Sequence, residues 1–94
     1  SHYSKDGRKE CIVEMEERYG AEITSVFCLT NAVKYIYRAG EKFGESATKD
    51  LSKAKWYFDY TNMLIDKYGI LVFNGILIEN LELYIDIKEM LENE

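Results

Sequence analysis

Residues 24–40, TSVFCLTNAVKYIYRAG, determine how the rest of the chain is interpreted. Apolar residues recur in this stretch at the three- and four-residue spacing of one helical face: Leu29, Ala32, Val33 and Ile36. Thr24 or Ser25 is placed to cap the start of a helix, and Gly40 is placed to end it. The stretch therefore predicts a helix over about 24–39 with one face in the core.

The same helix carries polar and basic side chains on a different face. That second stripe consists of Phe27, Asn31, Lys34 and Arg38, with Tyr35 beside it. The chain as a whole has a formal net charge of -5, so its basic residues are concentrated locally if they have a function. The pattern favours a helix with one buried face and one face turned towards a ligand.

Helical patterns also precede and follow this stretch. The segment RKECIVEMEERYG predicts a helix over about 8–19 that stops at Gly20. The segment TKDLSKAKWYFDYTNMLIDKYG, with Thr48 as its cap, predicts a helix over about 48–68 after a loop at 41–46. The inward stripe of this later helix is Leu51, Ala54, Phe58, Thr61 and Ile65.

The pattern changes in ILVFNGILIE, where two apolar runs flank Asn74 and Gly75. Asn-Gly between two such runs is a strong short-range signal for a two-residue β-turn, because both turn positions need a positive φ. The segment therefore predicts a β-hairpin with strands at about 70–73 and 76–79.

The tail after residue 80 has two interpretations. Positions 81, 83, 85 and 87 alternate as in a strand, whereas Leu81, Tyr84, Lys88 and Leu91 fit a helix with an acidic outer face. The ending KEMLEN favours the helix. The expected fold class is α+β, mostly α: a three-helix core, a short β-hairpin at about 70–79 and a C-terminal helix, in a single domain spanning 1–94.

An isolated hairpin has consequences for assembly. Two-stranded sheets are marginally stable alone, and their outer edges offer unpaired backbone groups to other chains. We therefore expect a homo-oligomer, a dimer or higher, that associates through the 70–79 hairpin. The alternative is a monomer in which the hairpin packs on its own helices.

Composition excludes several classes of function. The net charge of -5 in 94 residues argues against general nucleic-acid binding, which relies on clustered Lys and Arg. No apolar run approaches the roughly 18 residues that a membrane span needs, and the polar start of the sequence does not resemble a secretion signal. Cys11 and Cys28 are too few for a zinc site, so we expect no metal centre and reduced thiols in a cytoplasmic protein.

Two antiparallel helices joined by a short loop would bring basic residues together at one corner. Arg38 and Lys42 from the first helix would lie near Lys49, Asp50 and Lys53 of the second. Arginine binds phosphate through two parallel N–H bonds and lysine adds a point charge, while the start of the helix near Thr48 would add backbone donors. In the alternative interpretation these are solvated surface residues, and Asp50 merely pairs with one of them.

Other constellations are weaker. Glu10, Glu14 and Glu17 form an acidic stripe that resembles the metal-binding carboxylates of all-helical nucleotide pyrophosphohydrolases, but the E-x-x-D that family has on a later helix is not reproduced, and a solvated helix face is preferred. His2 is the single histidine and lies near the terminus, so no Ser-His-Asp or Cys-His set can be assembled. The glycine-rich G-x-x-x-x-G-K-[ST] loop of many nucleotide kinases is not in the sequence.

Several motifs together resemble a known family. They are HY at 2–3, ECI at 10–12, NAVKYIYRAGEK at 31–42 and DLSKAKWYF at 50–58. In order and spacing they are similar to a family of small phage and prophage proteins, catalogued as a domain of unknown function and labelled nucleotide kinase-like. The resemblance implies a protein of the cytoplasm of an infected bacterial host cell. It also implies nucleotide- or phosphate-binding roles for His2, Tyr3, Asn31, Lys34, Tyr35, Arg38, Lys42, Asp50, Lys53, Trp56 and Tyr57.

The resemblance and the basic corner together lead to three hypotheses. The first is a phage-type protein that binds a nucleotide or a nucleotide-derived phosphate without a cofactor, and sequesters a nucleotide signal of host defence. The second is a nucleoside monophosphate kinase or nucleotide phosphohydrolase, with Mg²⁺ bound by Asp50 or by the glutamates of the first helix. The third is an inhibitor that binds a host protein through its acidic surface.

Overall fold

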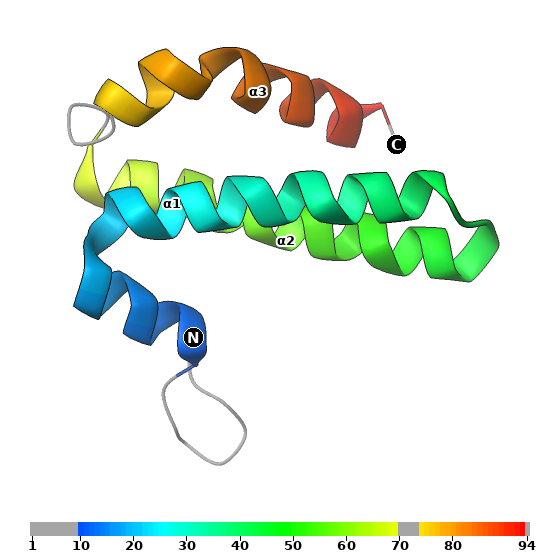
Figure 1. Ribbon diagram of the computed structural model, residues 1–94, viewed down its shortest axis with the longest axis horizontal. Helices are drawn as coiled ribbons and strands as arrows, with labels where there is room; N and C mark the ends of the chain where they lie inside the picture. The colour runs from blue at the N-terminus through cyan, green and yellow to red at the C-terminus, as the bar shows by residue number, and fades with distance from the viewer. Residues whose placement is uncertain (1–9, 70–73, 94) are drawn as a thin grey trace.

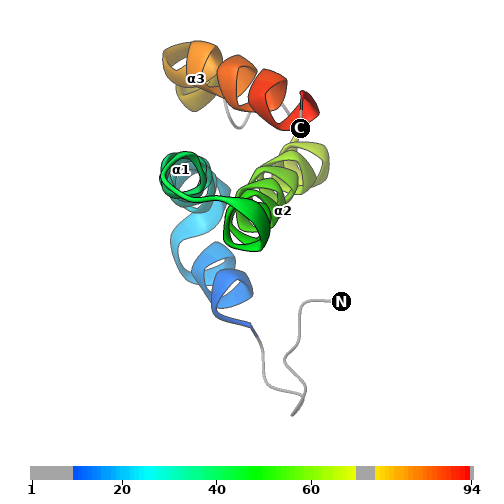
Figure 2. The same ribbon diagram turned by 90° about the vertical axis from the view of Figure 1, so that its right-hand side faces the viewer.

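A computed structural model describes residues 10–69 and 74–93, and the described residues form three α-helices. They are α1 (Cys11–Gly40), α2 (Gly44–Tyr68) and α3 (Asn74–Glu92). The main part of α1 lies antiparallel to α2 along its length, and α3 crosses one face of this pair (Figure 1). The first residues of α1 lie on the opposite face of the pair, as the end-on view shows (Figure 2).

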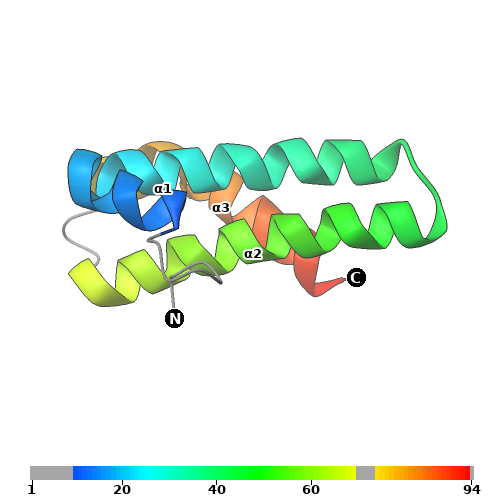
Figure 3. The ribbon, with the colours of Figure 1, turned by 90° about the horizontal axis from the view of Figure 1, so that it is seen from below.

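Helix α1 is sharply bent at Gly20. This residue has φ 89° and ψ 168°, a combination that is essentially restricted to glycine. Residues 11–19, the N-terminal segment, therefore turn back across the α1–α2 pair instead of continuing along the helix axis (Figure 3). The predicted helix stop at Gly20 is confirmed.

The helix resumes directly after this bend, so the predicted caps of the second helix are wrong. Thr24 and Ser25 lie inside α1, and their hydroxyls donate to backbone carbonyl oxygens one turn earlier. The Thr24 hydroxyl donates to Gly20 O at 2.9 Å, and the Ser25 hydroxyl donates to Ala21 O at 2.8 Å. One glycine is sufficient to redirect the chain, and no separate loop is needed.

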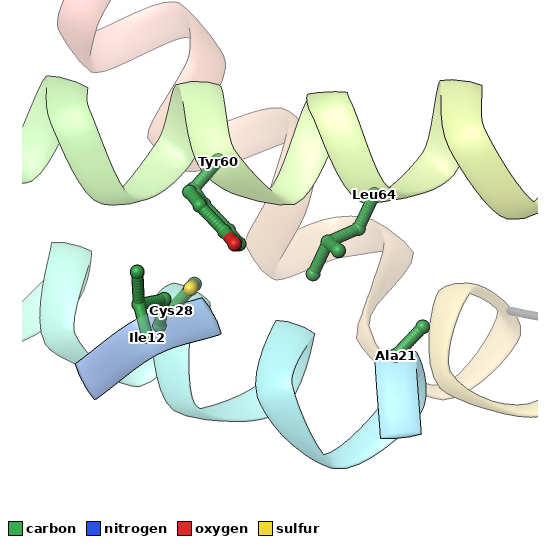
Figure 4. Packing of buried hydrophobic residues seen from close by; sticks show 5 residues of the cluster. All are labelled: Ile12, Ala21, Cys28, Tyr60 and Leu64. Carbon is green, nitrogen blue, oxygen red and sulfur yellow. The ribbon is translucent and has the colours of Figure 1, made fainter. Parts of the chain in front are cut away.

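The side chains between the helices form two buried apolar clusters. The first cluster lies beside the N-terminal segment and contains Ile12, Ala21, Cys28, Tyr60 and Leu64 (Figure 4). The second lies beneath α3 and contains Leu29, Ala32, Ala54, Phe58 and Ile87. Leu29 and Ala32, predicted to face inward, are buried, as are Ala54, Phe58 and Thr61 of the predicted α2 stripe.

The predicted α+β fold is wrong, because the described residues contain helices and no strand. Asn74 and Gly75 begin α3, and the predicted strand at 76–79 lies inside that helix, whereas 70–73 lie outside the described residues. Short apolar runs fit a buried helix as well as a strand, and Asn and Gly are both common at helix starts. The predicted C-terminal helix is confirmed but begins earlier, and self-association no longer follows from exposed strand edges.

Helix α2 begins four residues before the predicted cap at Thr48. Its first residue is Gly44, with φ 62°, and the Thr48 hydroxyl donates to Gly44 O at 3.2 Å within the first turn. The connection to α1 is therefore only 41–43. Since Thr48 and Lys49 lie inside the helix, their backbone N–H groups are not the free helix-start donors that the sequence suggested.

Candidate functional site

A buried carboxylate, Asp50, lies at the end of the α1–α2 pair that carries the connecting turn. Its side chain is only 3% exposed, and Lys42 Nζ donates to its Oδ2 at 2.7 Å. Arg38 Nε lies 3.9 Å from the same oxygen, and Lys53 Nζ lies 4.0 Å from Oδ1. Three cations from α1, the turn and α2 thus converge on one carboxylate.

These contacts keep Asp50 charged. The hydrogen bond from Lys42 is the largest cause that moves the pKa of Asp50 below its ordinary value of 3.8; burial opposes it, and the charges of Lys42, Arg38 and Lys53 add to the lowering. Asp50 is therefore a carboxylate at neutral pH, and it orients cations that would otherwise repel one another.

The ring of Tyr35 lies among cations at the same place. Lys34 Nζ is 4.5 Å from the ring centroid. The Arg38 guanidinium carbon and Lys53 Nζ are each 5.4 Å from it. These distances lie within the range of cation–π attraction. We call the group formed by Lys34, Tyr35, Arg38, Lys42, Asp50, Lys53 and Tyr57 the basic corner.

The basic corner has a positive charge that the whole chain lacks. Its four cationic side chains outnumber its one carboxylate, Asp50, so three positive charges remain uncompensated within the group. The chain as a whole has a net charge of -5. The positive charge is therefore local, as the sequence pattern predicted.

A row of aromatic rings extends from the basic corner along α2. Tyr35 stacks on Tyr57 with ring centroids 5.9 Å apart and planes 9° apart. Trp56 meets Tyr57 edge to face at 5.1 Å and stacks on Tyr60 at 5.5 Å. Trp56 is 45% exposed, so part of its indole is available to a bound molecule.

Not every predicted site residue joins this group. The Asn31 side chain donates to Phe27 O of its own helix at 2.9 Å, which uses its amide locally. Lys49, expected near Asp50, pairs instead with Glu45 at 3.6 Å. His2 and Tyr3 lie outside the described residues.

A second buried carboxylate, Glu16, was missed by sequence reasoning. It accepts hydrogen bonds from Tyr60 at 3.0 Å, Tyr68 at 2.6 Å and Lys67 at 2.5 Å, all from α2. The signal was present, since Glu16 lies four residues after Ile12 and three before Tyr19, on the apolar stripe of the N-terminal segment.

These partners determine the ionisation of Glu16. Burial alone would raise the pKa of Glu16, but the hydrogen bonds from Lys67, Tyr68 and Tyr60 outweigh it and leave the pKa below 4.5. The same contacts raise the pKa of Lys67 and Tyr68, while burial and then Glu16 raise the pKa of Tyr60. By contrast, Glu14 of the predicted acidic stripe is exposed and pairs with Arg18 at 3.6 Å.

An open apolar groove of about 850 Å³ lies between α3 and the turn end of the α1–α2 pair. Its lining residues are Val33, Ile36, Tyr37, Ala39, Gly40, Glu41, Ala47, Leu51, Asp86, Ile87 and Met90. The charged groups in this lining, Glu41 and Asp86, are both acidic, so the groove does not suit a phosphate. None of the basic corner residues lines it.

Comparison with known proteins connects the basic corner to one family. The pattern of a protein family of unknown function, DUF3310, matches residues 1–59. The chain belongs to the DUF3310 family. The DUF3310 match includes the N-terminal segment and every residue of the basic corner, and it ends shortly after Tyr57. The family description names no activity, so the kinase-like label gains no support from this match.

No curated protein and no solved structure matches the DUF3310 chain. In the part that the structure describes, no helix has the length and apolar character needed to cross a membrane. Among the same residues, no three His, Cys, Asp or Glu side chains are grouped so that they could bind a metal ion.

Proposed function

We propose that the basic corner binds a phosphate-bearing ligand, and that a nucleotide fits it best. The observation that supports this proposal is the convergence of Arg38, Lys42 and Lys53 on the buried Asp50. The expected anion site at the meeting point of the two helices is thus supported by side-chain geometry, although not by the helix-start donors.

Asp50 holds the cations in place but compensates only one of the four positive charges. Arg38 approaches it through Nε, which leaves the terminal amino groups of the guanidinium for another acceptor. Lys42 and Lys53 each have further N–H donors beyond the one directed at Asp50. A phosphate at this place gains charge-assisted hydrogen bonds from side chains that are already held in position, which lowers the entropic cost of binding.

The aromatic row favours a nucleotide over inorganic phosphate. Trp56 is partly exposed beside Tyr57, and Tyr57 stacks on the Tyr35 ring among the cations. Stacking of a base on such a ring contributes roughly 1–3 kcal/mol. A ligand with both a phosphate and a base therefore uses both halves of the site.

Trp56 also provides the measurement, because it is the single tryptophan of the chain. Its fluorescence, together with calorimetry, is to be followed during titration with inorganic phosphate and with mono-, di- and cyclic nucleotides. We expect saturable binding of at least one nucleotide and weaker binding of phosphate alone. If no member of the panel binds at high micromolar concentration, the proposal is wrong.

Charge-matched variants locate the binding. Arg38→Ala and Lys53→Ala each remove a cation of the basic corner, and we expect each to weaken nucleotide binding about tenfold or more, since a hydrogen bond to a charged group contributes roughly 1.5–3 kcal/mol. Lys55→Ala is the control, because Lys55 lies on α2 and pairs with the exposed Asp59 at 3.2 Å. Equal losses in all three variants would indicate a general charge effect rather than a site.

Binding without turnover makes the protein a sink for its ligand, which is what sequestration of a nucleotide signal of host defence requires. The nucleotide that binds best is to be incubated with the protein and Mg²⁺, and then recovered and analysed. Unchanged nucleotide supports a binding protein. Conversion to another phosphorylated or hydrolysed product supports the alternative, a kinase or phosphohydrolase.

A further inference from the structure

The N-terminal segment, residues 11–19, is connected to the rest of α1 through a single non-helical residue, Gly20. At Gly20 the backbone leaves the helical conformation, with φ 89° and ψ 168°. No atom lies within 4 Å of the position that a Cβ would occupy there. Glycine is thus required by the backbone conformation and not by lack of space, and rotation at this one residue would move the whole segment.

The N-terminal segment is fixed to α2 chiefly through Ile12 and Glu16, its two buried side chains. Ile12 lies in the first apolar cluster with Tyr60 and Leu64 of α2. Glu16 accepts from three donors in the second half of α2, as described above. A carboxylate buried to this extent is stable in place only while its donors satisfy it.

Beneath the segment lies a thiol. Cys28 is fully buried in the same cluster as Ile12. Burial raises the pKa of the Cys28 thiol to about 12, so little thiolate is present while the segment is closed. Movement of Ile12 away from the cluster would expose this thiol.

Tyr57 connects the segment to the basic corner. It packs against the cluster that contains Ile12 and stacks on Tyr35. Burial is the largest cause that raises the pKa of Tyr57, and Tyr35, Cys28 and Cys11 add to it in that order.

From these contacts we infer that residues 11–19 form a strap, hinged at Gly20 and latched by Glu16, whose closure holds Tyr57 in the basic corner and favours ligand binding. The coupling to a ligand rests on the proposed nucleotide-binding function, whereas the hinge and the latch do not. Because coupling is reciprocal, a bound nucleotide also favours the closed strap.

The hinge and latch are tested without ligand. In a Cys11→Ser background Cys28 is the single thiol, and its rate of reaction with a thiol reagent measures opening. We expect Glu16→Gln to increase this rate at least about tenfold, and Tyr68→Phe to increase it less, since it removes one of three donors. Glu14→Gln is the matched control, because Glu14 is an exposed carboxylate of the same segment.

Strap opening is distinguished from global unfolding by its dependence on urea. Local opening exposes little surface, so the labelling rate should depend only weakly on urea at low concentration. If labelling required global unfolding, its rate would depend on urea as strongly as the unfolding equilibrium does. Equal rates for Glu16→Gln and Glu14→Gln, or labelling with the full urea dependence, would overturn the strap.

The coupling is tested by adding the nucleotide that binds best. We expect saturating nucleotide to slow Cys28 labelling by the factor by which the closed strap binds the nucleotide more tightly than the open strap does. An unchanged labelling rate, while Trp56 fluorescence reports binding, would overturn the coupling. If no nucleotide binds, the proposed function and the coupling are both wrong. The Cys28 labelling rates measured without ligand then still test whether the segment is hinged at Gly20 and held by Glu16.

Discussion

At the scale of single residues, two buried carboxylates connect parts of the chain that are distant in sequence. Asp50 attracts cations from α1, the turn and α2, and Glu16 attracts donors from the far end of α2. A buried charge is costly unless it is paired, and removal of one partner leaves the others unsatisfied. Substitutions that preserve the shape of either side chain but remove its charge should therefore lower the stability of the protein.

Asp50→Asn should lower the melting temperature by several degrees. The amide cannot compensate the positive charges of Lys42 and Arg38, which would then repel each other across the α1–α2 turn. Thermal unfolding followed by circular dichroism measures the effect. Asp59→Asn is the control, since Asp59 is an exposed carboxylate on the same helix; equal shifts for both variants would contradict the structural role of Asp50.

Leu64→Ala should destabilise the protein by about 2–5 kcal/mol, the usual cost of truncating a fully buried leucine. Leu64 is 0% exposed in the cluster between α2 and the N-terminal segment. Ile23→Ala is the comparison, because Ile23 is 58% exposed and should change the free energy of unfolding by less than about 1 kcal/mol. Urea unfolding of both variants gives the two values, and a small loss for Leu64→Ala would show that α2 is not packed as described.

At the scale of helices, sequence periodicity predicted which helix faces are buried better than it predicted the residues at which the helices begin. Leu29, Ala54 and Phe58 were predicted inward and are buried, because a helical stripe requires only regular spacing. The caps at Thr24 and Thr48 were wrong, because a hydroxyl inside a helix can donate to the preceding turn instead. The β-hairpin predicted from Asn-Gly at 74–75 was wrong, because the turn preference of this pair is local and the apolar residues after it continue into α3.

Gly69→Ala should destabilise the protein by about 1–3 kcal/mol, because Gly69 ends α2 with φ 86° and ψ 152°, where residues with a Cβ are strained. Gly40→Ala is a matched comparison at the end of α1. Gly40 has no positive φ and no atom near the position of a Cβ, so we expect no loss of stability there and a gain of up to about 1 kcal/mol. Urea unfolding of the two variants should show a loss in the free energy of unfolding for Gly69→Ala and no loss for Gly40→Ala. Equal losses would contradict the assigned backbone conformations.

At the scale of the whole molecule, the chain is acidic, and among the described residues the basic corner concentrates positive charge. The sequence predicted that Arg38, Lys42, Asp50 and Lys53 meet, because i, i+3 and i+4 spacing and a short turn bring them together, but it also placed Lys49 there, which pairs with Glu45 instead. It did not predict that Asp50 would be buried at the centre, since burial depends on how closely two helices approach. It also missed Glu16, because its partners Lys67 and Tyr68 are about 50 residues away in the sequence.

The two buried carboxylates also predict how stability depends on pH. The folded-state pKa of Glu16 lies below 4.5 and that of Asp50 below 3.8, so each contributes stability that is fully present above those ordinary values. This contribution is lost as the pH falls through the folded-state pKa values. The melting temperature should therefore fall as the pH is lowered below about 4.5.

The Glu16→Gln variant isolates the part of this pH dependence that belongs to Glu16. At neutral pH wild-type protein should melt well above Glu16→Gln, because the charged carboxylate accepts hydrogen bonds from Lys67, Tyr68 and Tyr60. As Glu16 becomes protonated the two proteins become alike, so the difference in melting temperature should shrink as the pH falls below about 4.5. Calorimetric melts of both proteins across this range test it, with Glu14→Gln as the exposed-carboxylate control. A difference between wild type and Glu16→Gln that stays constant with pH would show that the carboxylate charge is not what fixes the N-terminal segment to α2.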